Sequence, residues 1–250
     1  MPSDSNHLTS RQRDFLRGRQ RPGPPTARVL MPQAPPPPPA TLSPSRFQHT
    51  LSSVSANWAF FCMVAVGLIC AVDRNEENAT APFSVAITAV AAVHYYAIVD
   101  ARTRASVDAQ PGLVDRIRYS DWFVTLPIMA YEMRMLGMDE DALLPRWPSP
   151  LLAAATIAFG GVWRFADAEA GRWGAFLASC AFAGLLIIDL VLASLEAHDG
   201  PWLLAIVGVF CLYPVIATVP LSIATRDAAF AFVDVFSKCG LALVSVGVLT

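Results

Sequence analysis

Lysine is almost absent from this chain of 250 residues, and charged residues of every kind are scarce. Of the 18 basic residues, 17 are arginine and one, Lys238, is lysine. Only 15% of the residues are charged, whereas soluble domains carry about a quarter. Hydrophobic residues make up 54% of the chain. This composition excludes a single soluble globular domain and whole-chain disorder, and it predicts an all-α membrane protein. The net charge of −2 gives no reason to expect a nucleic-acid partner.

Cysteine is also sparse, and its five copies form no recognisable framework. None belongs to a CxxC pair, the number is odd, and all lie in apolar stretches. A disulfide framework or a zinc site is therefore not expected, and no other metal site is predicted. Small buried packing residues are the simplest interpretation. The five are Cys62, Cys70, Cys180, Cys211 and Cys239.

Residues 1–50 differ in composition from the rest of the chain. They hold 11 of the 20 prolines and seven arginines, and they show no apolar core pattern. We predict a disordered, partly polyproline tail, followed by a single domain over residues 51–250. The tail lacks the apolar stretch of a secretory signal peptide. Its Arg-rich, acid-poor character is also compatible with an organelle targeting segment, so the host membrane stays open.

Seven apolar stretches follow the tail, separated by short polar connections. Each is close to the roughly 20 residues that a helix needs to cross the hydrocarbon of a bilayer. The sequence therefore predicts a seven-transmembrane helix bundle in lipid, with little room for an extramembrane domain. The stretches are 53–72, 82–101, 117–137, 148–166, 173–194, 201–221 and 227–249.

Lys238 lies about midway along the seventh stretch. A bare ammonium is costly at that depth, so the amine must be neutral, paired or covalently modified. Asp234 precedes it by four residues and shares its helix face. A buried pair that only fixes helix packing and a functional pair both agree with this spacing.

The third stretch carries more ionisable groups than packing requires. Asp121 and Glu132 are eleven residues apart, which is about three helical turns, so both face the same way about 16 Å apart along the axis. Arg118 and Thr125 lie on the same face.

Polar residues in the other stretches are weaker evidence for a function. His94-Tyr95 in the second stretch fits ordinary packing, and Tyr213-Pro214 in the sixth fits a kink.

Taken together, these motifs resemble those of the microbial (type 1) rhodopsins, most closely the light-driven proton pumps of the proteorhodopsin and xanthorhodopsin group. The third stretch, RYSDWFVTLP from Arg118 to Pro127 followed by Glu132, looks like their counterion and donor helix. DVFSK, from Asp234 to Lys238, looks like their retinal-lysine motif. His94-Tyr95 matches a pair in their second helix. The similarity covers residues 53–250.

The resemblance implies that Lys238 holds all-trans-retinal as a protonated Schiff base. Asp121 would be the primary counterion and proton acceptor, Asp234 the second counterion, and Glu132 the cytoplasmic proton donor. A protonated imine needs a carboxylate partner in a low dielectric, and a donor needs an apolar surrounding that keeps its proton.

Further residues receive supporting roles from the same resemblance. Thr125 would hydrogen-bond Asp121, His94 would pair with Asp121, and Arg118 would lie on the release side. The hydroxyls of Tyr95 and Tyr213 would bond Asp234. The residues expected to line the chromophore are Trp122, Met129, Tyr213, Tyr95, Phe210 and Ser179.

Three positions depart from the family pattern. Phe210 stands where tryptophan is usual, and Ala217 stands where another aromatic is usual, so a loosened retinal pocket or a truncated cytoplasmic half of the sixth helix is expected. The stretches on either side of Tyr213 are also short. Phe176 falls where xanthorhodopsin-like proteins have a small residue that opens a carotenoid site, which argues against an antenna carotenoid.

The family topology and the positive-inside rule disagree about how the chain is oriented in the membrane. The family topology puts the amino terminus outside, where the seven tail arginines and most loop arginines would lie. Arg74, Arg134 and Arg146 would lie inside. The positive-inside rule favours the reverse orientation. We keep the family orientation, because the order of donor and acceptor along the third stretch depends on it.

The function expected from these residues is an outward light-driven proton pump, an ion transporter and not an enzyme. A photosensory rhodopsin that signals to a partner protein is the alternative, although such sensors usually lack a carboxyl like Glu132. A non-photochemical seven-helix transporter or receptor with a Lys–Asp lock is a third hypothesis. The carboxylic acid at Asp121 disfavours a chloride pump. The third stretch has Asp121, Thr125 and Glu132 and not an Asn/Asp/Gln set, which disfavours a sodium pump. A homo-oligomer stays open.

Overall fold

The computed structural model describes residues 46–72, 79–104, 111–137 and 148–249, and all regular secondary structure among them is helical. The predicted tail lies outside the described residues except for 46–50, which belong to the first helix. Most of the two connections that contain Arg74 and Arg146 also lies outside the described residues. The helices are α2 (Arg46–Val72), α3 (Ala81–Arg104), α4 (Pro111–Gly137), α5 (Pro148–Phe165), α6 (Glu169–Glu196), α7 (Gly200–Phe210), α8 (Leu212–Thr218) and α9 (Ile223–Ser245).

The described helices form seven spans, because α7 and α8 are two parts of one. The sequence predicted a kink at Tyr213-Pro214 within the sixth stretch, 201–221, and the helix is interrupted at Cys211 and ends at Thr218. Pro214 explains the break, since proline has no N–H for the carbonyl of Phe210 and its ring clashes with that carbonyl. Cys211 keeps a nearly helical conformation (φ −65°, ψ −17°), so the span continues in the same general direction.

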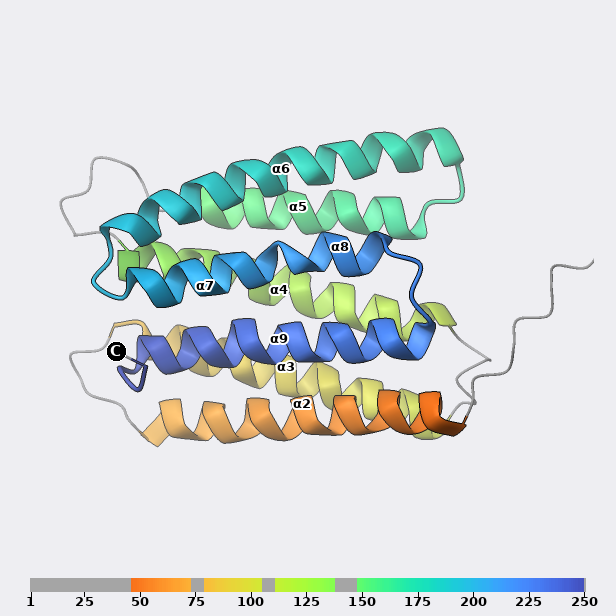
Figure 1. Ribbon diagram of the computed structural model, residues 1–250, viewed down its shortest axis with the longest axis horizontal. Helices are drawn as coiled ribbons and strands as arrows, with labels where there is room; N and C mark the ends of the chain where they lie inside the picture. Colours follow the sequence, from red (N-terminus) through yellow and green to blue (C-terminus); the bar gives the residue numbers. More distant parts are fainter. Residues whose placement is uncertain (1–45, 73–78, 105–110, 138–147, 250) are drawn as a thin grey trace, which may run out of the picture. The chain divides into compact units, whose positions relative to one another are not determined.

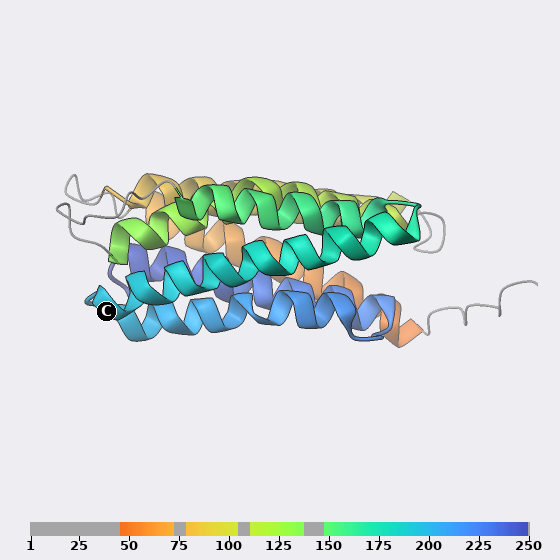
Figure 2. The ribbon, with the colours of Figure 1, turned by 90° about the horizontal axis from the view of Figure 1, so that it is seen from above.

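The seven spans form a closed ring (Figure 1). Each of α2 to α7 contacts the next in chain order, and α7 and α8 both contact α9, which returns to α2. Across the ring, α4 also contacts α6 and α9, and α3 contacts α9. Figure 2 shows the same helices running roughly parallel to one long axis. As a result, α4 and α9 meet at the centre of the bundle.

The last helix begins four residues earlier than predicted. The sequence placed the start of the seventh stretch at Asp227 because charged residues precede the apolar run. In the structure Ser222 caps α9: its hydroxyl oxygen accepts the backbone N–H of Thr225 at 3.2 Å. Serine at this position satisfies one of the free donors of the first turn. Arg226 and Asp227 are therefore helical residues and not loop residues.

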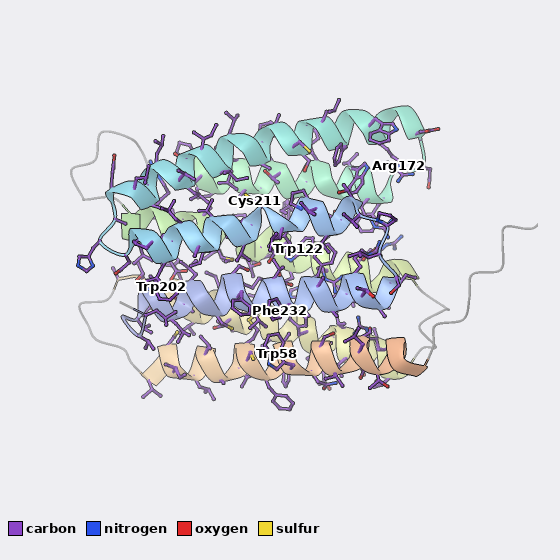
Figure 3. All side chains as sticks on the ribbon, viewed as in Figure 1. Trp58, Trp122, Arg172, Trp202, Cys211 and Phe232 are labelled. Atoms are coloured by element: carbon purple, nitrogen blue, oxygen red, sulfur yellow. The ribbon has the colours of Figure 1, made fainter. Side chains whose placement is uncertain are left out.

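Polarity is inverted relative to a water-soluble bundle. Five segments are long and apolar enough to cross a bilayer. Large apolar side chains such as Trp58, Trp202 and Phe232 are exposed on the outside (Figure 3). The charged face of α4 is buried, which is what lipid surroundings require of charged groups. The five segments are Thr50–Val72, Ala81–Thr103, Gly171–Glu196, Gly200–Thr218 and Ile223–Ser245.

Gly137, the last residue of α4, lies directly against the backbone of α6. A Cβ at this position would be 2.5 Å from the carbonyl oxygen of Ala193. We expect Gly137→Ala to lower the free energy of unfolding by about 1–3 kcal/mol, since backbone atoms must shift to admit the methyl group. Gly112→Ala on the same helix meets open space and is the matched control. Thermal unfolding in detergent tests this; equal midpoints for the two variants would contradict it.

Candidate functional site

Lys238 and two carboxylates form the centre of the bundle. The Nζ atom of Lys238 hydrogen-bonds Oδ2 of Asp121 and lies 3.8 Å from Oδ1 of Asp234. Lys238 and Asp121 are each 2% exposed, and Asp234 is fully buried. The contact joins α4 to α9, while Asp234 and Lys238 are one turn apart on α9. The i, i+4 spacing puts Asp234 beside Lys238, and the contact between α4 and α9 brings Asp121 to the same amine. The amine therefore lies between two acids.

The two carboxylates differ in how many hydrogen bonds they accept. Asp234 accepts three: Tyr95 donates to Oδ2 at 2.6 Å, and Tyr213 and Trp122 donate to Oδ1 at 2.5 and 2.9 Å. The two tyrosine bonds are those that the resemblance implies, whereas the indole bond was not predicted. Oδ1 of Asp121 has no hydrogen-bond partner in the part of the chain that the structure describes. Asp121 is therefore the carboxylate with a free acceptor position.

Thr125 and His94 lie beside Asp121, but neither hydrogen-bonds its carboxylate. The Thr125 hydroxyl donates to the backbone carbonyl of Asp121 at 2.9 Å. A threonine within a helix reaches the carbonyl four residues back more easily than a side chain one turn away. Nδ1 of His94 lies 2.8 Å from the carbonyl oxygen of Val90 and 4.0 Å from Oδ1 of Asp121. The predicted pairing is thus a near approach and not a hydrogen bond.

Arg118 points away from the Lys238 centre, toward the helix ends where α4 and α9 begin. Its Nη1 lies 3.1 Å from Oδ1 of Asp227, and the other oxygen of Asp227 bonds Arg102 at 2.7 Å. The guanidinium also lies over the ring of Phe230, 4.9 Å from its centroid. Arg118, Asp227 and Arg102 are all buried among α3, α4 and α9. Asp227 was not predicted as a site residue, although it precedes Asp234 by two turns on one helix face.

A second carboxylate, Asp115, extends this ionic network. It lies 3.7 Å from Nη1 of Arg118, bonds Arg164 of α5 through Nε at 2.9 Å, and lies 3.5 Å from Arg226. Arg102, Arg164 and Arg226 are therefore paired with buried acids and are not free loop charges. Arg134, which would lie on the inner side, is paired as well, with Asp189 at 3.4 Å. These ion pairs therefore leave the conflict with the positive-inside rule as it was, because that rule counts arginines and lysines and is not a net-charge rule.

Glu132 lies on the opposite side of the Lys238 centre, near the other end of α4. It is fully buried and accepts a hydrogen bond from the Ser84 hydroxyl. Ser245 interacts with the same carboxyl and is 2.6 Å from the hydroxyl of Thr80 at the start of α3. A layer of buried apolar side chains separates Glu132 from Lys238. This layer includes Ile87, Met129 and Leu241.

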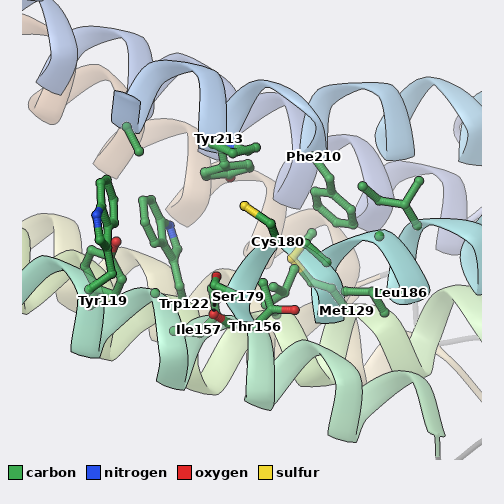
Figure 4. Close-up of a pocket in the computed structure, with 18 of the residues that line it drawn as sticks. Tyr119, Trp122, Met129, Thr156, Ile157, Ser179, Cys180, Leu186, Phe210 and Tyr213 are labelled. Atoms are coloured by element: carbon green, nitrogen blue, oxygen red, sulfur yellow. Dashed lines mark hydrogen bonds between the residues drawn. The ribbon is translucent and has the colours of Figure 1, made fainter. Parts of the chain in front are cut away.

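An apolar cavity of about 310 Å³ begins at Lys238 and extends among α4, α5, α6 and α8 (Figure 4). Its size is at the lower end of the range, about 300–1,000 Å³, that holds small ligands. Tyr213 and Phe210 lie on one side, and Thr156, Ile157 and Ser179 lie on the other. Mostly apolar walls and one amine at the end suit a long apolar ligand with an electrophilic end.

Most residues predicted to line the chromophore line this cavity. They are Trp122, Met129, Ser179, Phe210, Tyr213 and Lys238. Tyr95 is not among the lining residues, so its prediction as a direct contact is corrected: its hydroxyl is bound to Asp234 instead. Trp163 was not predicted, yet it also lines the cavity, and the centroid of its ring lies 5.1 Å from that of Phe176. This aromatic pair closes the cavity between α5 and α6.

Comparison with known families gives one match over most of the chain. The family described as "Bacteriorhodopsin-like protein" matches residues 49–250. No curated protein sequence matches the chain. The matched range covers all seven spans and leaves the Arg/Pro-rich segment outside.

Solved structures with the same arrangement of helices are rhodopsins. Xanthorhodopsin, described as a light-driven ion pump with dual chromophore, has a TM-score of 0.70 at 17% identity, covering 82% of this chain and 94% of its own. Exiguobacterium sibiricum rhodopsin has 0.63 at 21%, covering 78% and 93%. A light-driven proton pump from Leptosphaeria maculans has 0.65 at 14%, covering 78% and 93%. At these identities the similarity shows the seven-helix fold.

Proposed function

Because the chain belongs to the family of bacteriorhodopsin-like proteins, we propose that it is a light-driven outward proton pump with all-trans-retinal bound to Lys238. It is an integral, multi-pass membrane protein, as its apolar outer surface requires. Structures of the same fold include proteins described as light-driven proton pumps. The function itself is argued from the geometry around Lys238.

The cavity fits retinal in position and in chemistry. It is lined by the only lysine amine of the chain, and its other walls are mostly apolar or aromatic. Trp122, Met129, Phe210 and Tyr213 would hold the polyene, and Lys238 would bind its aldehyde carbon. When bound, retinal supplies the absorption of visible light and a change of shape at the Lys238 nitrogen. Phe176 and Trp163 fill the space beside the cavity, so we propose no antenna carotenoid there.

Asp121 is the proposed proton acceptor. It hydrogen-bonds Nζ of Lys238 directly, and its second oxygen has no donor among the described residues. Asp234 is the proposed second counterion, because Tyr95, Tyr213 and Trp122 occupy its oxygens and hold it in place. A proton that leaves Nζ therefore finds its free acceptor position on Asp121. Preorganised donors around Asp234 keep the second charge fixed during the transfer.

The observation that carries the proposal is the asymmetry along the bundle. On one side of Lys238, charged side chains run from Asp121 past Arg118 to Asp227 and Arg102. On the other side, the apolar layer of Ile87, Met129 and Leu241 separates Lys238 from the buried acid Glu132. A proton placed on Asp121 has polar groups ahead of it on the Arg118 side, while Glu132 lies on the other side, where it can supply the replacement proton. Such an arrangement favours net transfer in one direction.

Glu132 is the proposed proton donor, and its neutral amide variant tests the role. We expect Glu132→Gln to keep the resting colour, because Glu132 is remote from Lys238. Recovery of the resting absorbance after a flash should slow by about tenfold or more, since a positioned acid typically contributes ~10²–10⁴-fold. Azide, a small diffusible acid, should restore the rate. Flash photolysis with parallel recording of external pH measures both effects.

Glu132→Asp is the matched control, because it keeps a carboxyl in the same place. It should recover faster than Glu132→Gln in the same preparation. Equal recovery rates for the wild type and Glu132→Gln would remove the donor role and favour a photosensor over a pump.

A further inference from the structure

Hydroxyl groups connect the Glu132 carboxyl to the nearer end of the bundle. Ser84 of α3 donates to this carboxyl, and Ser245, the last residue of α9, interacts with it as well. Ser245 also donates to the hydroxyl of Thr80 at 2.6 Å. Thr80 directly precedes the first residue of α3. Polar side chains therefore continue from Glu132 past Ser245 to Thr80.

Thr80 and Ser245 lie where two membrane-spanning segments end. The segment Ala81–Thr103 begins one residue after Thr80, and the segment Ile223–Ser245 ends at Ser245 itself. Thr80 is 7% exposed and Ser245 is 6% exposed. Ala79 and Gly247, close to them along the chain, are exposed. The two hydroxyls are thus buried directly beneath residues that reach the surface.

Apolar side chains dominate the rest of this half of the bundle. Met133, Leu203 and Val244 are at most 2% exposed and belong to the buried apolar cluster. A buried hydroxyl costs free energy unless it is hydrogen-bonded, whereas an apolar side chain at the same position does not. Thr80 and Ser245 satisfy this requirement by bonding each other, so packing alone gives no reason for two hydroxyls here.

The other polar groups near Glu132 do not lead toward this end of the bundle. Thr88, one turn after Ser84 in the direction of Lys238, bonds the backbone carbonyls of Ser84 and Val85 at 2.8 and 3.1 Å. Arg134 is two residues from Glu132, so it lies on a different face of α4, and it pairs with Asp189 of α6. Among the described side chains, the polar connection from Glu132 to the helix ends is the one through Ser245 and Thr80.

We propose that Thr80 and Ser245 form a hydroxyl relay that recharges Glu132 with a proton from the water at this end of the bundle. The proposal rests on the proposed donor role of Glu132. It divides the return of the proton into two steps. Transfer from Glu132 to the Lys238 nitrogen crosses the apolar layer and does not use the relay, whereas transfer from water to Glu132 does.

A hydroxyl can take part because it carries one proton and two acceptor positions. After Glu132 has given up its proton, its carboxylate takes the proton of the Ser245 hydroxyl. Ser245 takes the proton of Thr80, and Thr80 takes one from water. Only O–H bonds break and form, and each hydroxyl ends with one proton, so the net result is one proton moved to Glu132. Ser245 donates to Thr80 in the structure, so both hydroxyls rotate about their C–O bonds before the transfer.

Thr80→Val and Ser245→Ala test the relay in the full-length, retinal-loaded protein. Flash photolysis follows the first step by visible absorbance, and a pH-indicator dye in the medium follows proton uptake. We expect the first step to stay within about twofold of the wild type and uptake to slow by about tenfold or more, since a positioned proton-transfer group typically contributes ~10²–10⁴-fold. The two substitutions lie in different segments, so a variant that fails to fold leaves the other to decide.

Three further variants separate the hydroxyl from the packing. Thr80→Ser and Ser245→Thr keep a hydroxyl and should take up protons much faster than Thr80→Val and Ser245→Ala. Ser194→Ala is the control for loss of a buried serine hydroxyl, because Ser194 of α6 is 1% exposed and bonds the backbone carbonyl of Leu190. It should leave both steps unchanged.

The outcomes separate the relay from the donor role. Slow uptake in Thr80→Val and Ser245→Ala, with a normal first step and recovery in the hydroxyl-bearing variants, supports the relay. Uptake at the wild-type rate, equal slowing of both steps, or a Thr80→Ser variant as slow as Thr80→Val overturns it. In each of these cases the donor role stands if Glu132→Gln slows the first step. A normal first step in Glu132→Gln overturns the donor role, and the relay with it.

Discussion

Replacement of Lys238 by alanine should give a protein that inserts into the membrane and remains colourless with retinal. A primary amine forms a covalent imine with an aldehyde and releases water, and Lys238 is the only lysine of the chain. We expect complete loss of visible absorbance, measured on purified protein after incubation with all-trans-retinal. A visible pigment formed by Lys238→Ala would contradict the retinal proposal.

A test on the wild type complements this variant, because removal of Lys238 leaves Asp121 and Asp234 facing each other without their cation. Such a loss of one partner from a buried charge cluster is destabilising by about 3–5 kcal/mol. Borohydride reduction of the retinal-loaded wild type avoids the problem. The retinyl group should be found on Lys238 by peptide mass spectrometry. Modification elsewhere in the chain, with Lys238 unmodified, would exclude the proposed attachment.

The second large effect is expected for Asp121→Asn. The substitution removes the charge that hydrogen-bonds Nζ of Lys238 and also removes the free acceptor oxygen. We expect absorption to move to longer wavelength, because the positive charge at the Lys238 nitrogen loses its nearest counter-charge. Light-driven proton transport should be abolished. Absorption spectra and external pH recordings of the same preparation measure the two effects.

Asp189→Asn is the control for this substitution. Asp189 on α6 pairs with Arg134 at 3.4 Å and bonds Ser149, away from the cavity and from Lys238. Neutralising it should leave the colour unchanged. An unchanged spectrum in Asp121→Asn would mean that Asp121 is not the counterion.

The seven spans could be predicted from the sequence because lipid leaves few choices. An apolar run of about 20 residues must be helical to satisfy its backbone in hydrocarbon, and seven such runs fill residues 53–249. The ends of the helices were less certain. Charged residues suggested that the last span begins at Asp227, whereas the helix begins four residues earlier, at Ile223, and is capped by Ser222. Polar residues at a helix end mark the membrane surface only if they face water, and Asp227 is buried.

The centre of the site was also visible in the sequence, since helical periodicity alone puts Asp121 and Glu132 on one face and Asp234 beside Lys238. Contacts between distant helices were not visible. Arg102 was assigned to a connection, yet it reaches Asp227 across the bundle. The indole of Trp122 was expected against the chromophore, and its N–H donates to Asp234 as well. Such pairings depend on how three helices meet, which periodicity within one helix does not encode.

The sixth span shows both what could be predicted from the sequence and what could not. Phe210 and Ala217 led us to expect a loosened pocket or a truncated cytoplasmic half of the helix. In the family orientation that half is α7, which is helical from Gly200 to Phe210, whereas the helix ends early in the other half, at Thr218. Pro214 suggested a kink, and the break at Cys211 agrees with it. The sequence did not indicate that α8 would have no buried residue, a feature that follows from its packing on α7 and α9.

Illumination of whole cells that contain the retinal-loaded protein, with external pH recorded, tests the central claim most directly. An outward proton pump should acidify the unbuffered medium in the light, and the change should reverse in the dark. A protonophore should abolish it, and Lys238→Ala cells should show none. A coloured protein that leaves the external pH unchanged in the light, or makes the medium alkaline, would contradict an outward pump.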